Sequence, residues 1–222
     1  MGDACSIAAM KKIAVLGSGI VGETLSGGFL KHGHEVMRAS REPSKLADWK
    51  AKAGDRARTG TFAEAAKWGD LVVLAVKGDA ALSALEMAGP ENTAGKTVID
   101  TTNPIAGPPV NGVLPYFTKM DESLMEQLQK ANPKAHLVKC FSCVGSPRMV
   151  NPDFGGTKPT MFVCGDDEAA KGEVKGILDV FGWETMDVGG VTAARAIEPL
   201  CILWCIPGFR ENSWTHAFKL LK

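Results

Sequence analysis

The feature that most constrains the fold is a glycine-rich turn directly after the first apolar run. Residues 12–16 (KIAVL) have the composition of a short strand, and residues 17–22 (GSGIVG) follow them and open a helical pattern. In a G-x-G-x-x-G turn, Gly17 permits the tight turn, Gly19 lets the backbone approach a pyrophosphate, and Gly22 lets helix and strand pack closely. The helix N-terminus adds free N–H groups and a positive dipole end. The strand–turn–helix context favours a dinucleotide-binding unit over a glycine-rich turn without a ligand.

Strands and helices alternate along most of the chain. Further strands are expected at residues 34–39, 56–59, 70–76, 97–100, 136–140, 160–165 and 184–188. Helices are expected after the turn, from residue 42, and at residues 61–68, 122–131, 168–181 and 193–221, the last with a break at Pro207-Gly208. The pattern predicts an α/β fold, a Rossmann-like doubly wound and mostly parallel sheet with a short C-terminal helical segment.

Three parts are expected along the chain. Residues 1–10 form a flexible leader, residues 11–191 an NADP-binding Rossmann-like domain, and residues 192–222 a helical segment that contacts the cleft and a dimer partner. Within the leader, residues 1–6 (MGDACS) fit the loose N-myristoylation pattern with a nearby cysteine. An unmodified leader is the simpler interpretation of so short a pattern.

Composition excludes several classes of protein. The chain of 222 residues carries 25 basic and 25 acidic side chains, so it lacks the positive charge typical of a nucleic-acid-binding protein. An apolar fraction of 45% argues against disorder. Six cysteines are too few for a disulfide scaffold and lie mostly in apolar runs, which predicts reduced thiols and a cytoplasmic location. No continuous apolar run is long enough for a transmembrane segment.

The end of the second strand indicates which dinucleotide is bound. An NAD site places Asp or Glu there, whereas this chain has Ala39-Ser40-Arg41. Arg41 can pair bidentately with a 2′-phosphate, the Ser40 hydroxyl can donate to it, and Lys45 can add a second positive charge. Glu42 leaves the alternative of an NAD site with the acid displaced in register. We expect NADP(H) rather than NAD(H).

Residues 13–22 (IAVLGSGIVG), residues 39–41 (ASR) and residues 98–104 (VIDTTNP) together resemble the NADP oxidoreductases that work with coenzyme F420, a deazaflavin. The resemblance continues through residues 137–141, 161–166 and 186–198, and the nucleotide domain is also similar to the cytosolic domain of STEAP-type metalloreductases. The Rossmann motif and the resemblance together predict these cofactor-binding residues: Gly17, Ser18, Gly19, Ile20, Val21, Gly22, Ser40, Arg41, Lys45, Val76, Lys77, Asn103, Pro104, Cys140 and Phe141.

The resemblance implies that residues 76–77 and 103–104 line the ribose and nicotinamide, with residues 138–141 beneath the nicotinamide. Ser142 departs from the metalloreductase-like pattern, which has Asn there, and the loop at residues 141–158 is peculiar to this chain. These departures leave the electron acceptor open.

Other chemistries have less support. Cys140 and Cys143 form a C-x-x-C pair, but it straddles a strand end and a loop rather than a helix N-terminus. Cys201 and Cys205 are better explained as small buried residues than as metal ligands, and no zinc or Ser-His-Asp spacing is present, so no metal and no catalytic side chain are expected. Hydride transfer between two flat coenzymes needs mainly orientation and exclusion of water.

We therefore expect an NADP(H)-dependent oxidoreductase that transfers hydride between NADPH and coenzyme F420 or a flavin (FMN or FAD). A non-catalytic NADP(H)-binding redox sensor and a reductase of a small imine or ketone are the alternatives. Residues 200–206 are apolar almost all round a helix, so something must cover them. We expect a homodimer with this helix at its interface.

Overall fold

The computed structural model describes residues 10–221. The predicted leader, apart from Met10, and the acylation pattern lie outside the described residues. The strands are β1 (Lys12–Leu16), β2 (Glu35–Ala39), β3 (Ala57–Gly60), β4 (Leu71–Leu74), β5 (Thr97–Asp100), β6 (His136–Lys139), β7 (Thr160–Val163) and β8 (Glu184–Asp187). The helices are α1 (Ile20–Lys31), α2 (Ala47–Ala53), α3 (Phe62–Trp68), α4 (Ala81–Ala88), α5 (Pro90–Thr93), α6 (Leu124–Ala131), α7 (Glu168–Phe181) and α8 (Ala194–Glu211).

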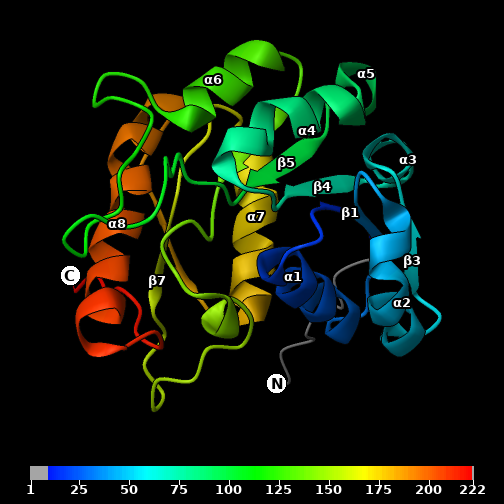
Figure 1. Cartoon of the computed structure of the whole chain (residues 1–222). Coiled ribbons are helices and arrows are strands. Elements are labelled where there is room, and N and C mark those ends of the chain that lie inside the picture. Colours follow the sequence, from blue (N-terminus) through cyan, green and yellow to red (C-terminus); the bar gives the residue numbers. More distant parts are fainter. Residues whose placement is uncertain (1–9, 222) are drawn as a thin grey trace, which may run out of the picture.

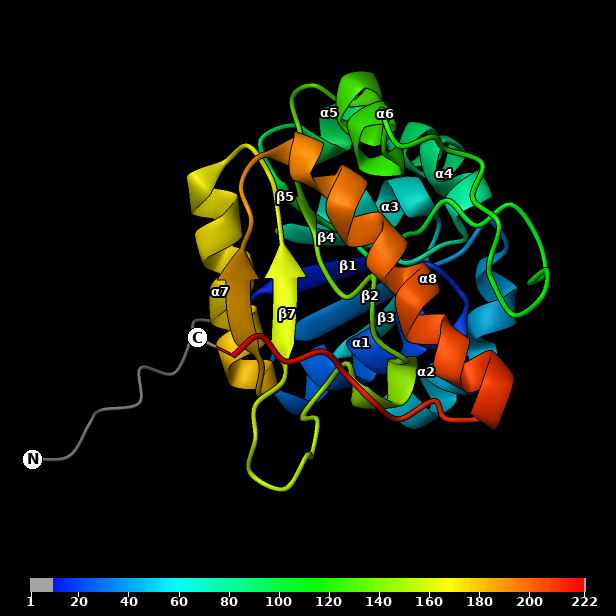
Figure 2. The same cartoon turned by 90° about the vertical axis from the view of Figure 1, so that its left-hand side faces the viewer.

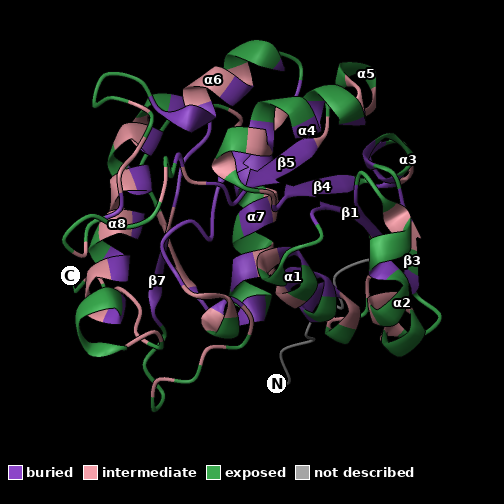
Figure 3. Ribbon diagram, in the orientation of Figure 1, coloured by how far each residue is buried: buried purple, intermediate pink, exposed green. Residues whose placement is uncertain are grey.

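Six strands form one parallel sheet in the order β3-β2-β1-β4-β5-β6. The chain builds outward from β1 in one direction and then returns to continue from β4 in the other, so the switch point lies between β1 and β4. This arrangement confirms the predicted Rossmann-like α/β fold. The central strands are buried, and Figure 3 shows them as the purple centre of the molecule.

Helices cover both faces of the sheet (Figure 1). In β1, Ile13 and Val15 pack with the residues of α1 and α7, whereas Ala14 and Leu16 face α3, α4 and α6. The alternation follows from the pleat, which turns successive side chains to opposite faces. A strand buried on both faces reads as a continuous apolar run, which is why the sequence predicted the central strands well.

Helix starts were predicted where a side chain caps them. Thr61 accepts a hydrogen bond from the Glu64 N–H at 3.3 Å, and the Glu64 carboxylate accepts one from the Thr61 N–H at 2.7 Å. This capping box confirms the predicted start of α3. The helices α4 and α5 were not predicted, because the segment between β4 and β5 carries no comparable signal.

The strands β7 and β8 form a separate parallel pair rather than an extension of the large sheet. A single antiparallel bridge between Lys139 and Cys164 joins β6 to the end of β7. Figure 2 shows the last residues running back from α8 across the start of β7. The Thr160 N–H donates to the Phe218 carbonyl at 2.8 Å, so the tail is fixed to this strand.

The C-terminal helix corrects one prediction. The break expected at Pro207-Gly208 is wrong, because α8 continues to Glu211 and ends at Asn212, whose φ of 53° is left-handed. At Gly208 a Cβ atom would lie 2.3 Å from the Trp214 ring, so glycine makes room for the returning tail. The residues after Asn212 are not helical, contrary to the prediction for this segment. Tertiary packing here outweighs the local effect of proline.

Within the described residues, the segment Val191–Glu211 is the one helix long and apolar enough, by length and composition, to cross a membrane. No transmembrane segment was expected from the sequence, because Glu198 and two prolines interrupt the apolar residues of this helix. Core helices of globular proteins meet the same criterion, and here 44% of the apolar window is buried inside the protein.

Candidate cofactor site

The glycine-rich turn joins β1 to α1 at the switch point. Gly17 has a φ of 154°, and a Cβ there would lie 2.1 Å from the Ala75 carbonyl oxygen, so only glycine fits. A Cβ at Gly22 would lie 2.6 Å from the Gly17 oxygen. Gly19 differs, because a Cβ there would meet no atom within 4 Å. No side chain caps α1 at Gly19, which leaves first-turn N–H groups free for an anion.

A large pocket of about 880 Å³ opens beside this turn, over the carboxyl ends of the parallel strands. Most of the predicted cofactor-binding residues line it: Gly17, Ser18, Gly19, Ile20, Val21, Ser40, Arg41, Lys45, Val76, Lys77 and Asn103. Residues from α4 and from the loop after β5 complete the wall. The structure thus brings together side chains that are more than 80 residues apart in the chain.

At the β2 end of the pocket, Arg41 is exposed and forms no ion pair with any described residue. Glu42, the acid of the alternative NAD site, is instead paired with Lys45, at 2.9 Å between Nζ and Oε2. The Ser40 hydroxyl accepts a hydrogen bond from the Glu42 N–H at 3.2 Å and keeps its own proton for a ligand. This end of the pocket therefore offers a free guanidinium and a hydroxyl, a pair suited to a phosphate.

At the other end, the loops after β4 and β5 touch directly. A Cβ at Gly78 would lie 2.0 Å from the Asn103 carbonyl oxygen, so this contact needs glycine. The Asn103 side-chain amide donates to the Ser142 carbonyl at 2.7 Å, while its Oδ1 atom is buried without a partner among the described residues. A buried amide oxygen without a donor is costly. Asn103 therefore lines the pocket with a side-chain amide whose nitrogen is bound and whose oxygen is buried and unpaired.

Four predicted residues lie behind the lining rather than in it. Gly22 packs against the turn, and Pro104 is buried. Cys140 is fully buried, and Phe141 packs its ring on Phe181, with 6.3 Å between the ring centroids. Phe141 also has a left-handed φ of 59°. The contact of Cys140 and Phe141 with a nicotinamide stays a prediction.

The C-x-x-C thiols are unsuited to redox chemistry. Burial raises the pKa of Cys140 well above its usual value, and burial raises the pKa of Cys143 to about 12. Both thiols therefore stay protonated near neutral pH, and the thiolate is the reactive form.

Among the described residues there is no group of three or more His, Cys, Asp and Glu side chains that could hold a metal ion.

Sequence reasoning missed a buried charge cluster behind Thr102. The Lys139 ammonium lies 2.6 Å from the Asp100 carboxylate, 2.8 Å from the Glu198 carboxylate and 3.0 Å from the Thr102 carbonyl. Glu198 also accepts hydrogen bonds from the first N–H groups of α6. Burial lowers the pKa of Lys139, but the two carboxylates outweigh burial and the net shift is upward. The sequence did contain a signal for this cluster, because each of these charged residues interrupts an apolar run.

Sequence reasoning also missed Arg38, a buried arginine in β2. Its guanidinium donates to the carbonyls of Gly17, Ser18 and Gly19, and to the Glu23 carboxylate. Burial lowers the pKa of Arg38, and the hydrogen bond that Arg38 donates to the Glu23 carboxylate opposes that shift. A charged residue at an inward position of a parallel strand was the available signal.

A doubly wound parallel sheet, with a glycine-rich turn at its switch point and a pocket over the strand ends, defines a Rossmann-like dinucleotide-binding protein. The family model described as "NADP oxidoreductase coenzyme F420-dependent" matches residues 12–104. A solved structure from Arthrobacter sp. FB24, described as a candidate F420-dependent NADP-reductase, is 33% identical. It superposes with a TM-score of 0.87 and covers 96% of this chain and 100% of that one. The chain belongs to the coenzyme F420-dependent NADP oxidoreductase family.

Two further relatives are more distant. Metalloreductase STEAP3 of Rattus norvegicus is 25% identical over 200 residues, and the match covers 88% of this chain but only 38% of that protein. A reductive aminase from Aspergillus terreus, solved with NADPH, has a TM-score of 0.64 at 20% identity over 88% of this chain and 60% of that one. The similarity to the reductive aminase shows only that the two proteins share a fold. The family places the chain among the NADP-dependent oxidoreductases.

Proposed function

We propose that this protein transfers hydride between NADPH and a flat coenzyme, coenzyme F420 or a flavin. The observation that carries the proposal is the pocket itself, which runs from Arg41 past the glycine-rich turn to Asn103. The part of the lining that the structure describes contains no histidine, cysteine or tyrosine, and its side chains that could act as a general acid or base are Glu42, Lys45, Lys77 and Asp79. A reductase of a ketone or imine usually needs a proton donor at the reacting group, whereas transfer between two coenzymes does not.

The chain's own residues supply binding and orientation. The first-turn N–H groups of α1 would hold the pyrophosphate, and Ser40 and Arg41 the 2′-phosphate. The loops that meet at Gly78 and Asn103 would hold the nicotinamide end. The bound NADPH supplies the hydride. The place of Asn103 in the pocket lining, at the end away from Arg41, supports this orientation.

Arg41→Ala is expected to weaken NADPH binding about 10- to 150-fold, because it removes a charge-assisted bidentate contact of about 1.5–3 kcal/mol. NADH lacks the 2′-phosphate, so its affinity should stay within about twofold. Titration calorimetry with both dinucleotides measures the effect. An equal loss for NADH would show that Arg41 supports the fold and does not select the phosphate.

The acceptor is tested by stopped-flow absorbance with purified protein, NADPH, and either F420 or FMN. Oxidation of NADPH with one of them is expected, and Cys140→Ser and Cys143→Ser should retain most of the rate, since their thiols are protonated. Binding of NADPH without oxidation by either acceptor would favour a redox sensor. Loss of turnover in Cys140→Ser with the fold intact would indicate thiol chemistry.

We also propose a cytoplasmic homodimer. The described cysteines Cys140, Cys143, Cys164, Cys201 and Cys205 are all free thiols, which fits a reducing compartment.

On α8, Leu203 and Phe209 stay exposed although the opposite side of the helix is buried. An apolar stripe of this kind fits an isologous contact with a second copy. Light scattering at micromolar concentration distinguishes a dimer from a monomer.

A further inference from the structure

The guanidinium of Arg38 lies directly beneath the glycine-rich turn. Its Nε donates to the Gly17 carbonyl at 3.2 Å, and its Nη2 donates to the carbonyls of Ser18 at 2.8 Å and Gly19 at 2.9 Å. Nη1 pairs with the Glu23 carboxylate at 3.2 Å. Arg38 is only 1% exposed, so the surrounding protein fixes the whole side chain in this position.

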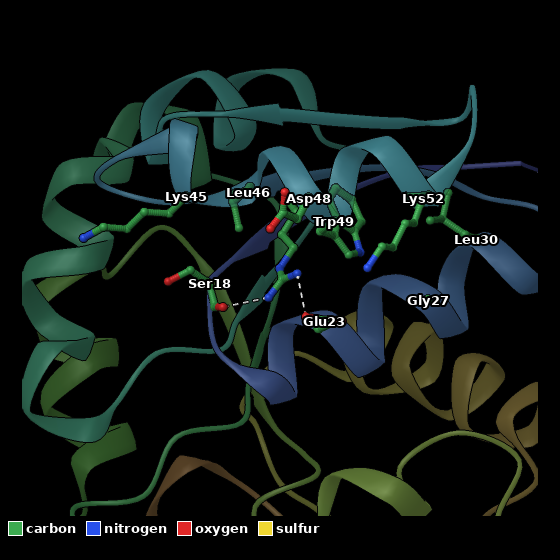
Figure 4. A pocket seen from close by; sticks show the side chains of 11 residues that line it. Ser18, Glu23, Gly27, Leu30, Lys45, Leu46, Asp48, Trp49 and Lys52 are labelled. Carbon is green, nitrogen blue, oxygen red and sulfur yellow. Dashed lines mark hydrogen bonds and ion pairs between the residues drawn. The ribbon is translucent and has the colours of Figure 1, made fainter.

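A side pocket of about 300 Å³ adjoins this arginine, between α1 and α2. Figure 4 shows Ser18 and Glu23 on one side of it and Trp49 of α2 on the other. The Trp49 ring centroid lies 5.3 Å from the Arg38 guanidinium carbon, a cation–π distance. The guanidinium is thus held on both sides and keeps its orientation under the turn.

The hydrogen bonds that Arg38 donates help to fix where the turn's N–H groups point; the Gly19 carbonyl also accepts the first backbone hydrogen bond of α1, from the Glu23 N–H at 3.0 Å. In a planar trans peptide the C=O of one residue and the N–H of the next point in opposite directions. When the carbonyls of residues 17–19 point toward Arg38, the N–H groups of Ser18, Gly19 and Ile20 point away from it. All three residues line the large pocket, on the side where a phosphate would lie.

We propose that Arg38 is a positioning residue for the pyrophosphate: it orients the N–H groups of residues 18–20 toward the pocket without touching the ligand. This inference rests on the proposed NADP(H) function. Arginine suits the role because its planar fork donates to several carbonyls at once, whereas lysine is a point charge on a flexible stem.

The test compares a ligand that contains the pyrophosphate with one that lacks it. NADPH and adenosine 2′-monophosphate are titrated by calorimetry against the wild type, Arg38→Met, Arg38→Lys and Arg41→Ala. Arg38→Met is expected to weaken NADPH at least about 10-fold while adenosine 2′-monophosphate changes less than about twofold. Arg38→Lys should fall between wild type and methionine. Arg41→Ala should weaken both ligands, because both carry the 2′-phosphate.

Arg58→Met is the matched control, since Arg58 lies on the neighbouring strand β3, is largely exposed and lines neither pocket. It should bind both ligands like the wild type. If Arg38→Met does not fold, Arg38→Lys alone carries the comparison. Proportional weakening of both ligands, or no weakening of NADPH, overturns the role of Arg38 while leaving the NADP site intact. A wild type that binds neither ligand overturns the proposed function and this inference together.

Discussion

Replacing Lys139 by methionine is expected to lower the free energy of unfolding by about 3–5 kcal/mol. The substitution keeps an unbranched side chain only one atom shorter but removes the cation between Asp100 and Glu198. These carboxylates are 0% and 2% exposed, so water cannot replace the lost partner. Urea unfolding measures the change, and a lower midpoint with an unchanged slope shows that stability alone has altered.

Lys171→Met is the matched control. Lys171 is also buried and contacts two carboxylates at 2.8 Å, but Glu168 is 84% exposed and Asp187 is 44% exposed. Water can hydrate both of them once the lysine is gone, so the expected loss is about 1 kcal/mol or less. Equal losses for the two variants would contradict the view that burial of the carboxylates decides the cost.

The pH dependence of this cluster follows from the direction of the Lys139 shift. The pKa of Lys139 is raised above its ordinary value of 10.5 in the folded chain. A raised pKa means that the lysine stabilises the fold fully below the unfolded pKa and loses that contribution as pH rises through the folded one. The cluster should therefore hold at neutral pH and fail only in strongly alkaline solution.

The cluster also explains how the C-terminal helix reaches the site. Glu198 of α8 contacts Lys139 of β6 and the first N–H groups of α6, while Lys139 contacts the Thr102 carbonyl beside the pocket. The Tyr116 hydroxyl adds a hydrogen bond to the Glu198 carbonyl at 2.8 Å. One buried ion cluster therefore fixes α6, α8 and the end of β5 relative to one another.

The parts of the fold that were predicted from sequence depend on local chemistry. The turn at residues 17–22 needs glycine at Gly17 and Gly22 for its own packing, and a strand such as Leu71–Leu74 is buried on both faces and reads as one apolar run. The position of the pocket could be predicted too, because parallel strands bring their carboxyl ends to one edge of the sheet. Local patterns and the global fold agree in these segments.

What could not be predicted depends on contacts between distant segments. Pro207 predicts a helix end, but α8 continues past it to Glu211, with the Trp214 ring packed over Gly208. Arg38 was read as part of an ordinary strand, because nothing in the neighbouring sequence shows that three carbonyls from the preceding turn surround it. Cys140 and Phe141 follow a site strand, yet their side chains point into the core. Position along the chain does not fix the direction of a side chain after the strand has ended.

Gly19 should be dispensable for folding but required for NADPH binding. Its φ of −78° and ψ of 176° are open to any residue, and a Cβ there would meet no protein atom within 4 Å. Gly19→Val is therefore expected to melt like the wild type. Its side chain would fill the space through which a pyrophosphate reaches the N–H groups, so the NADPH affinity should fall at least about 100-fold, the equivalent of about two charge-assisted hydrogen bonds.

Gly17→Ala is the contrasting variant. Gly17 has a left-handed φ of 154°, and its Cβ would lie 2.1 Å from the Ala75 oxygen, so alanine strains the turn itself. Its melting temperature should fall clearly below that of Gly19→Val, with thermal unfolding and NADPH titration measured on both. A Cβ at Gly19 would meet no protein atom within 4 Å, which fits the proposed approach of a pyrophosphate from the pocket. Wild-type NADPH affinity in Gly19→Val would place the pyrophosphate elsewhere.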